Sequence, residues 1–217
     1  MASKRATVRR KPVQERGLRR MERILDAADA VIARAGFDAA TTNAIARRAR
    51  TAIGSLYQFF PNKDAVLAAL CERHLRRLHD LHEGLFSADL SRLPFADMFD
   101  RIVDTLAGYH AENPGFQPLF FGSTTSPALA AAADRLRAEC IARVEGLMAL
   151  RMPGVDAKHR RQLAEINVDT VRAVLPRATA ADPAVRETML RELKRMMTVY
   201  AEDCWRRFGG PSAAPAS

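Results

Sequence analysis

Apolar residues recur at helical spacing along almost all of this 217-residue chain, and this periodicity limits the fold more than any other feature. Ile24, Ala28, Val31, Ile32 and Ala35, for example, trace one face of a first helix. No stretch alternates apolar and polar residues between hairpin turns, as half-buried strands do. The pattern therefore predicts an all-α protein.

Proline, glycine and asparagine residues divide this pattern into segments. Gly36 is a predicted C-cap for the first helix, and Thr41 or Thr42 is a predicted N-cap for the second. The predicted helices lie at 16–35, at a short segment around Ile45, at 52–59, for some 20 residues from Lys63, and near 95–112, 116–121, 127–151, 157–175 and 183–207. The helix from Lys63 is long enough to link two domains.

The positive charge is concentrated in the N-terminal part of the chain. The net charge is +9, and residues 1–82 hold 17 Lys+Arg against 8 Asp+Glu, whereas the rest holds 17 of each. A basic segment on a neutral remainder favours a polyanionic partner such as nucleic acid. The alternative for its first residues is a solvated tail that only aids solubility.

Several classes of protein are disfavoured by what the sequence lacks. It has no apolar run of about 18 residues and no apolar stretch of a signal peptide after the basic N-terminus, so we expect a cytoplasmic protein without a membrane partner. The three cysteines are far apart and predict neither a disulfide framework nor a metal-binding pair. No nucleotide-binding or hydrolase motif occurs in its required context, so we expect no cofactor and no enzyme activity.

Three short helices separated by tight turns, with a third helix of about two turns, are typical of a helix-turn-helix unit. Ile45, Ala46 and Ala49 would face inward, and Leu56 and Phe60 would complete that core. The residues left exposed on the third helix carry hydroxyl, amide and aromatic groups and no acid, namely Ile53, Gly54, Ser55, Tyr57, Gln58 and Phe59. Such a surface suits base edges, thymine methyl groups and phosphates.

These residues carry a family resemblance. The string Ile53-Gly54-Ser55-Leu56-Tyr57-Gln58-Phe59-Phe60-Pro61-Asn62-Lys63-Asp64 resembles the recognition-helix signature of the tetracycline-repressor (TetR/AcrR) family, and Gly36-Phe37-Asp38-Ala39-Ala40-Thr41-Thr42-Asn43-Ala44-Ile45-Ala46 resembles the pattern before it. The resemblance implies an α-helical homodimer that binds a palindromic DNA operator and is released by a small effector. On this basis we expect a basic arm at 1–15, a DNA-binding domain at 16–62, an effector and dimerisation domain at 63–208, and a tail at 209–217.

One segment departs from the family pattern. Arg50-Thr51-Ala52 stands where the family usually has Gly-Val and a small capping residue. If the turn keeps a left-handed conformation, Arg50 adopts it at a steric cost. The alternatives are a reshaped turn, or recruitment of Arg50 towards phosphates.

The resemblance implies DNA contacts at Thr42, Asn43, Ser55, Tyr57, Gln58 and Lys63. By their chemistry, Thr42, Tyr57 and Lys63 would hold phosphates, and Gln58 and Ser55 would reach base edges. The alternative for Tyr57 is a ring packed in the core, and for Lys63 a solvated residue of the first helical turn.

The remaining helices would bind the effector and the second copy. Large or polarisable apolar side chains such as Phe99, Phe120 and Cys140 can line a cavity or a core, and Tyr109, His110, Asn167 and Thr170 interrupt apolar faces. We expect a mostly apolar ligand that hydrogen-bonds to Tyr109, Asn167 or Thr170, with structural polar groups as the alternative. The apolar stripes on 157–175 and 183–207 would form the dimer interface or, alternatively, an intramolecular core.

Two other functions remain open from the sequence. One is a DNA-binding or architectural protein without an effector. The other is a metal-dependent enzyme, whose candidate ligands are His74, His79, His82 and Glu83.

Overall fold

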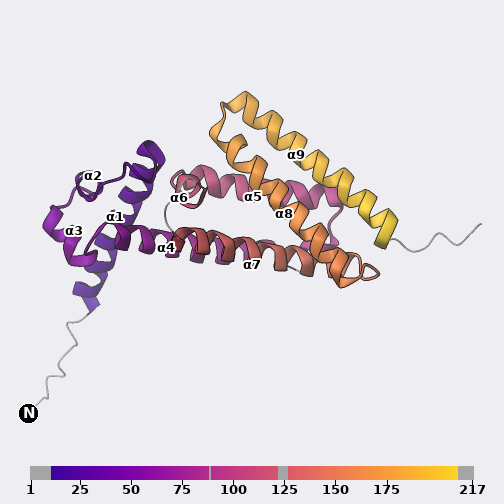
Figure 1. Cartoon of the computed structure of the whole chain (residues 1–217), viewed down its shortest axis with the longest axis horizontal. Helices are drawn as coiled ribbons and strands as arrows, with labels where there is room; N and C mark the ends of the chain where they lie inside the picture. The colour runs from indigo at the N-terminus through magenta and orange to yellow at the C-terminus, as the bar shows by residue number, and fades with distance from the viewer. Residues whose placement is uncertain (1–10, 88, 122–126, 210–217) are drawn as a thin grey trace, which may run out of the picture. The chain divides into compact units, whose positions relative to one another are not determined.

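The computed structural model describes residues 11–87, 89–121 and 127–209, and the chain is almost entirely helical over these ranges, with no strand among them (Figure 1). The helices are α1 (Lys11–Ala35), α2 (Thr42–Arg48), α3 (Ile53–Phe59), α4 (Lys63–Leu85), α5 (Phe95–Glu112), α6 (Phe116–Phe121), α7 (Pro127–Arg151), α8 (Ala157–Ala180) and α9 (Pro183–Cys204). A 3₁₀ turn covers Leu90–Arg92, and a π-helical turn covers Trp205–Gly209. The all-α prediction is confirmed.

Local sequence signals explain many of the helix ends. Gly36 follows α1 with φ +80°, which glycine adopts without strain. The Thr41 side chain accepts a hydrogen bond from the Ala44 amide at 3.1 Å, so Thr41 rather than Thr42 caps α2. Asp156 and Asp182 cap α8 and α9 in the same way.

Three predicted helix boundaries are wrong. α1 begins at Lys11 rather than at residue 16, so residues 11–15 of the expected arm are helical. The helix expected to end at 175 continues through Pro176 to Ala180, because Leu175, Pro176 and Ala178 are buried and their packing offsets the amide hydrogen bond that proline cannot donate. The last helix ends at Cys204, and the chain continues as a π-helical turn.

The chain divides into two compact units. We call them the N-terminal unit, Met1–Arg73 with Pro114–Thr124, and the C-terminal unit, His74–Asn113 with Thr125–Ser217. The boundary therefore falls within α4, and α6 groups with the N-terminal helices, whereas the sequence suggested a division after residue 62.

The N-terminal unit packs α1 to α3, the first half of α4 and α6. Ile24, Ile32, Ile45, Leu56 and Leu70 are fully buried in it. Arg73 joins α4 to α1, because its guanidinium lies 2.7 Å from Asp26 Oδ1 and 3.1 Å from Glu22 Oε2. The α2–α3 segment is thus supported by a small apolar core and a buried arginine.

α6 is held to α1 by Gly115, the residue that precedes it. The Gly115 amide donates to Asp29 Oδ2 at 3.3 Å. A Cβ atom at position 115 would lie 2.4 Å from the Asp29 carbonyl oxygen, so the approach requires glycine.

The C-terminal unit is a helical bundle in which α8 packs against α7 and α9, and α5 packs against α8 and α9 (Figure 1). Its main core contains Leu85, Leu90, Met98, Phe99, Ile102, Val103, Leu147, Leu175, Leu193 and Met197. A second cluster forms around Ile141, Ala164 and Val168 between α7 and α8. No helix in the described ranges combines the length and apolar character needed to cross a membrane.

Candidate nucleic-acid interface

The turn between α2 and α3 keeps the left-handed conformation. Arg50 has φ +50°, and it is the one non-glycine residue with positive φ among those described. The Arg50 amide donates to the Arg47 carbonyl at 3.2 Å and the Thr51 amide to the Ala46 carbonyl at 3.0 Å. This pair of bonds defines a Schellman motif, in which glycine usually takes the position that Arg50 holds.

The α3 face predicted to read DNA is exposed. Leu56 and Phe60 are buried as expected, whereas Gln58 is exposed and the Tyr57 side chain is 48% exposed. The alternative that Tyr57 packs in the core is therefore wrong. Residues 39–63 contain no aspartate or glutamate, so no acid within this segment would repel phosphates.

Two of the expected DNA contacts lie together. Thr42 Oγ1 and the Tyr57 hydroxyl are 3.2 Å apart and share a hydrogen bond between the start of α2 and the middle of α3. Thr41 makes the capping bond, which leaves the Thr42 hydroxyl to this partner. Asn43 is exposed near the start of α2, and Ser55 is half-buried in α3.

Lys63 has a structural role that the sequence did not suggest. Its Nζ donates to the carbonyl oxygens of Phe37 at 2.9 Å and of Asp38 at 3.0 Å, and lies 5.1 Å from the centre of the Phe37 ring. An ammonium group has three donors, so one remains for another acceptor. Lys63 therefore joins the start of α4 to the loop between α1 and α2, and the alternative of a merely solvated lysine is wrong.

Two of the four candidate metal ligands, His79 and Glu83, are bound to an arginine instead. Arg143 Nη1 lies 2.8 Å from Glu83 Oε1, and Arg143 Nη2 donates to His79 Nδ1 at 3.3 Å. The Arg143 hydrogen bond and charge lower the pKa of Glu83. His74 Nδ1 is hydrogen-bonded to the Tyr109 hydroxyl at 2.9 Å. In the described part of the chain, no group of three His, Cys, Asp or Glu residues has the geometry to hold a metal ion.

The expected ligand residues are distributed among different parts of the fold. Phe99 belongs to the main core of the C-terminal unit, Cys140 lies beside the Ile141 cluster, and Phe120 packs at a tilt against Phe116 within the N-terminal unit. The buried Asn167 donates to the Leu163 carbonyl at 2.7 Å, and Thr170 is half-buried. Burial raises the pKa of the Cys140 thiol to about 11, so it stays protonated at neutral pH.

His82 is a buried polar residue that the sequence analysis did not assign to the effector. It follows Leu78 by four residues and precedes Leu85 by three, so it interrupts the apolar face of α4. Its Nδ1 is buried without a hydrogen-bond partner among the described residues. Burial, followed by the charges of Arg143 and His79, lowers its pKa to about 4. Tyr109 and Asn167 are predicted ligand residues because they interrupt apolar helix faces, and the same pattern applies to His82.

A groove of about 530 Å³ lies on the C-terminal unit between α5 and α9. Asp100, Asp104, Leu190, Lys194 and Val199 are among its lining residues. Lys194 forms ion pairs across the groove lining, with Asp104 at 2.7 Å and with Asp100 at 3.5 Å. None of the expected ligand residues lines this groove.

The apolar stripes of α8 and α9 are divided between core and surface. Leu163, Leu193 and Met197 are buried within the chain, whereas Ile166 and Met196 are about half exposed. Val185 and Val199 of α9 are also exposed. The buried residues of these stripes form an intramolecular core, and the exposed residues are the ones that a dimer interface could use.

Two sequence profiles match the chain. Residues 24–70 match the profile described as bacterial regulatory proteins, tetR family, and residues 94–200 match the tetracyclin repressor-like, C-terminal domain. Over 59 residues the chain is 39% identical to the HTH-type transcriptional repressor KstR of Mycolicibacterium smegmatis, which is 27% of this chain and 29% of that repressor. The chain thus spans less than a third of this relative's length.

Solved structures share the fold over most of the chain. A TetR-like transcriptional regulator from Rhodococcus sp. RHA1 aligns with a TM-score of 0.65 and 19% identity, covering 87% of this chain and 94% of that one. The regulator FadR of Bacillus subtilis, in complex with stearoyl-CoA, aligns with a TM-score of 0.57 and 18% identity, covering 79% and 96%. With both sequence profiles matched in order, this chain belongs to the TetR family of bacterial transcriptional regulators.

Proposed function

We propose that this protein is an operator-specific transcriptional repressor that acts in the cytoplasm and inserts α3 into the major groove of DNA. The observation that carries the proposal is the acid-free surface of α2 and α3, on which Tyr57 and Gln58 are exposed. The identity with KstR over 59 residues supports the assignment as a repressor.

The geometry supports a division of work within this surface. Thr42 and Tyr57 share a hydrogen bond in which one hydroxyl donates, so the hydroxyl that accepts keeps its own hydrogen to donate to a phosphate oxygen. The Lys63 ammonium has one donor left for a phosphate. Asn43 lies beside Thr42 in the first turn of α2. Gln58, with Ser55, reads base edges, because a glutamine amide can donate and accept at once.

The experiment is a selection of bound sequences from random duplex DNA with the full chain. The proposal predicts a recurrent motif with two inverted half-sites. Recovery of no motif from a folded protein that still binds DNA would favour an architectural protein instead.

A homodimer is the second part of the proposal. The exposed side chains of Ile166, Val185, Met196 and Val199 lie on α8 and α9, and a second copy would bury them around a two-fold axis. A charge at Met196 would be buried at such an interface, so Met196→Glu should shift the protein to monomers in sedimentation and weaken operator binding. Leu150→Glu, at another exposed apolar position, is the control that should stay dimeric.

The third part is release from DNA by a small, mostly apolar effector held by Phe99, Phe120, Cys140, Tyr109, Asn167 or Thr170. Because the Tyr109 hydroxyl and the Asn167 amide already have partners, a ligand must use their remaining hydrogen-bonding capacity or replace those partners. His82, with its buried Nδ1, is an additional candidate to hydrogen-bond the ligand.

Stearoyl-CoA is a suitable first probe, since FadR of Bacillus subtilis holds it in a related fold. A true effector must bind less tightly when the operator is present, by the same factor by which it weakens operator binding. A compound whose affinity is identical with and without operator is not the effector. If a broad set of apolar compounds leaves operator binding unchanged, an effector-independent DNA-binding protein is the better account.

A further inference from the structure

Arg50 occupies a backbone position that usually belongs to glycine. It is the residue after the C-cap in the Schellman motif that ends α2, with φ +50°. A Cβ atom makes this conformation unfavourable, and glycine avoids the penalty. The fold itself therefore gains nothing from an arginine at this position.

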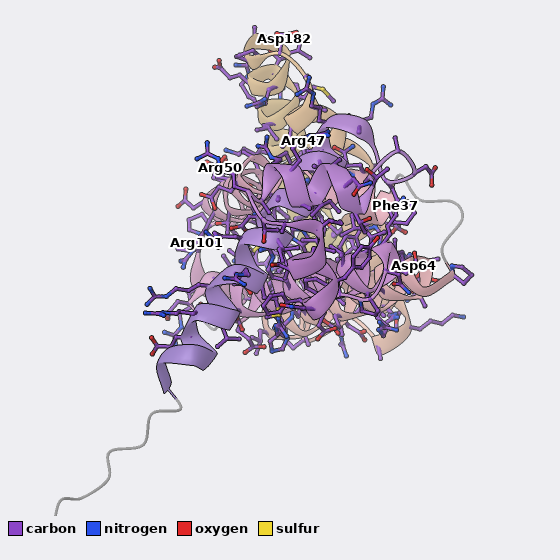
Figure 2. All side chains as sticks on the ribbon, turned by 90° about the vertical axis from the view of Figure 1, so that its left-hand side faces the viewer. Phe37, Arg47, Arg50, Asp64, Arg101 and Asp182 are labelled. Carbon is purple, nitrogen blue, oxygen red and sulfur yellow. The ribbon has the colours of Figure 1, made fainter. Side chains whose placement is uncertain are left out.

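The Arg50 side chain also lacks a structural use within the described residues. It is exposed, and it makes no hydrogen bond or ion pair with any side chain or carbonyl that the structure describes. Figure 2 shows Arg47 and Arg50 at the outer surface of the α2–α3 segment. No acidic residue lies within residues 39–63 to neutralise them.

We propose that Arg50 is a DNA-binding residue that holds a backbone phosphate from the turn between α2 and α3. The turn joins the helix that begins with Thr42 and Asn43 to the helix that carries Tyr57 and Gln58. A planar guanidinium can make two parallel hydrogen bonds to a phosphate, which a compact ammonium cannot. Strained backbone conformations cluster at functional sites, where the side chain of the strained residue contacts a bound partner.

This inference rests on the proposed function and adds a contact to it. A phosphate contact fixes the orientation of α3 on the duplex and carries no sequence information. Arg50 therefore contributes equally to the operator and to unrelated duplexes, in contrast to Gln58.

The test compares Arg50→Gly, Arg50→Lys and Arg101→Ala with the wild type. Binding is measured by fluorescence anisotropy against salt concentration, on the selected operator and on an unrelated duplex. Arg50→Gly should weaken binding to both duplexes by the same factor and reduce the slope of log affinity against log salt by about 0.9 per phosphate contact, hence by about 1.8 for a dimer that loses one contact from each copy. Its thermal midpoint should equal or exceed that of the wild type, because the strain is removed.

The two other variants separate charge from position. Arg50→Lys keeps the charge, so it should keep the salt slope and lose affinity only through the second hydrogen bond. Arg101→Ala removes an exposed arginine from α5 and should leave the slope unchanged, which excludes an effect of net charge alone.

An Arg50→Gly variant with the wild-type affinity and salt slope would overturn the inference and leave the proposed function intact. A changed motif preference in Arg50→Gly would overturn it as well, because it would place Arg50 at a base. Absence of DNA binding by the wild type would instead reject the proposed function, and this inference with it.

Discussion

Gln58 and Lys63 differ at the scale of single residues, although the sequence predicts that both contact DNA. Gln58 is exposed on α3, whereas the Lys63 ammonium is engaged by the carbonyl groups of Phe37 and Asp38. Replacing each residue by alanine should therefore change DNA binding in a different way.

Replacement of Gln58 should change specificity. Gln58→Ala should cost about 1–3 kcal/mol on the preferred base and relax the selected motif at one position in each half-site, because the amide that hydrogen-bonds the base is removed. Repeating the selection with the variant measures this. A motif identical to that of the wild type would contradict the assignment of Gln58 to base readout.

Replacement of Lys63 should change both affinity and stability. Lys63→Ala should weaken all duplexes about equally and lower the free energy of unfolding by about 1–2 kcal/mol, since it removes two charge-assisted hydrogen bonds to carbonyls. Salt titrations and urea unfolding give the two quantities. Loss of stability with full DNA affinity would reduce Lys63 to a structural residue.

His82 should make the stability depend on pH. Its pKa is lowered to about 4 by burial and by Arg143 and His79, whereas in the unfolded chain it is 6.5. Between about pH 6.5 and pH 4, His82 is therefore protonated in the unfolded chain but neutral in the folded chain. The free energy of unfolding falls as pH drops from about 7 towards 4. Between pH 7 and pH 5 this residue should account for about 2 kcal/mol of the loss. Urea unfolding of His82→Gln should show a loss smaller by that amount, and equal losses would contradict the buried neutral state.

At the scale of elements, helix-breaking residues in the sequence predicted the position of most helices. Pro94, Asn113-Pro114-Gly115 and Pro127 bound helices that the structure places at Phe95–Glu112, Phe116–Phe121 and Pro127–Arg151, as predicted. These boundaries are local effects of missing amides and restricted backbone angles, so a sequence reveals them. The start of α1 was missed because Lys11 to Gln14 show no apolar face.

Contacts between distant elements were beyond prediction. The bonds of Lys63 to the α1–α2 loop and of Tyr109 to His74 join residues 25 or more positions apart, and no local pattern encodes them. For the same reason, the sequence predicted the chemistry of the proposed DNA-binding face but not the hydrogen bond between Thr42 and Tyr57.

The approach of α6 to α1 gives a prediction at this scale. Gly115→Ala should destabilise the N-terminal unit by about 1–3 kcal/mol, because the new methyl group would overlap the Asp29 carbonyl of α1. Gly146→Ala in α7 is the matched control, since no atom lies within 4 Å of its new Cβ and it should stabilise by about 0.5–1 kcal/mol. Similar unfolding midpoints for the two variants would contradict a tight approach at Gly115.

At the scale of the whole molecule, the net positive charge lies in residues 1–82. The expected DNA-contacting arm was residues 1–15, but α1 begins at Lys11 and residues 1–10 lie outside the described ranges. Deletion of residues 1–10 removes Lys4, Arg5, Arg9 and Arg10 and leaves α1 whole. The slope of log affinity against log salt should shrink by about 0.9 for each phosphate that the shortened protein no longer neutralises, with an unchanged thermal midpoint. An unchanged slope would make the segment a solvated tail.

The ratio of affinities for the selected operator and for bulk duplex DNA at physiological salt tests the central claim most directly. A dimeric repressor that reads bases through α3 should prefer its operator by a factor of about 10³ or more. Equal affinity for both DNAs, measured with folded dimeric protein, would contradict operator-specific binding.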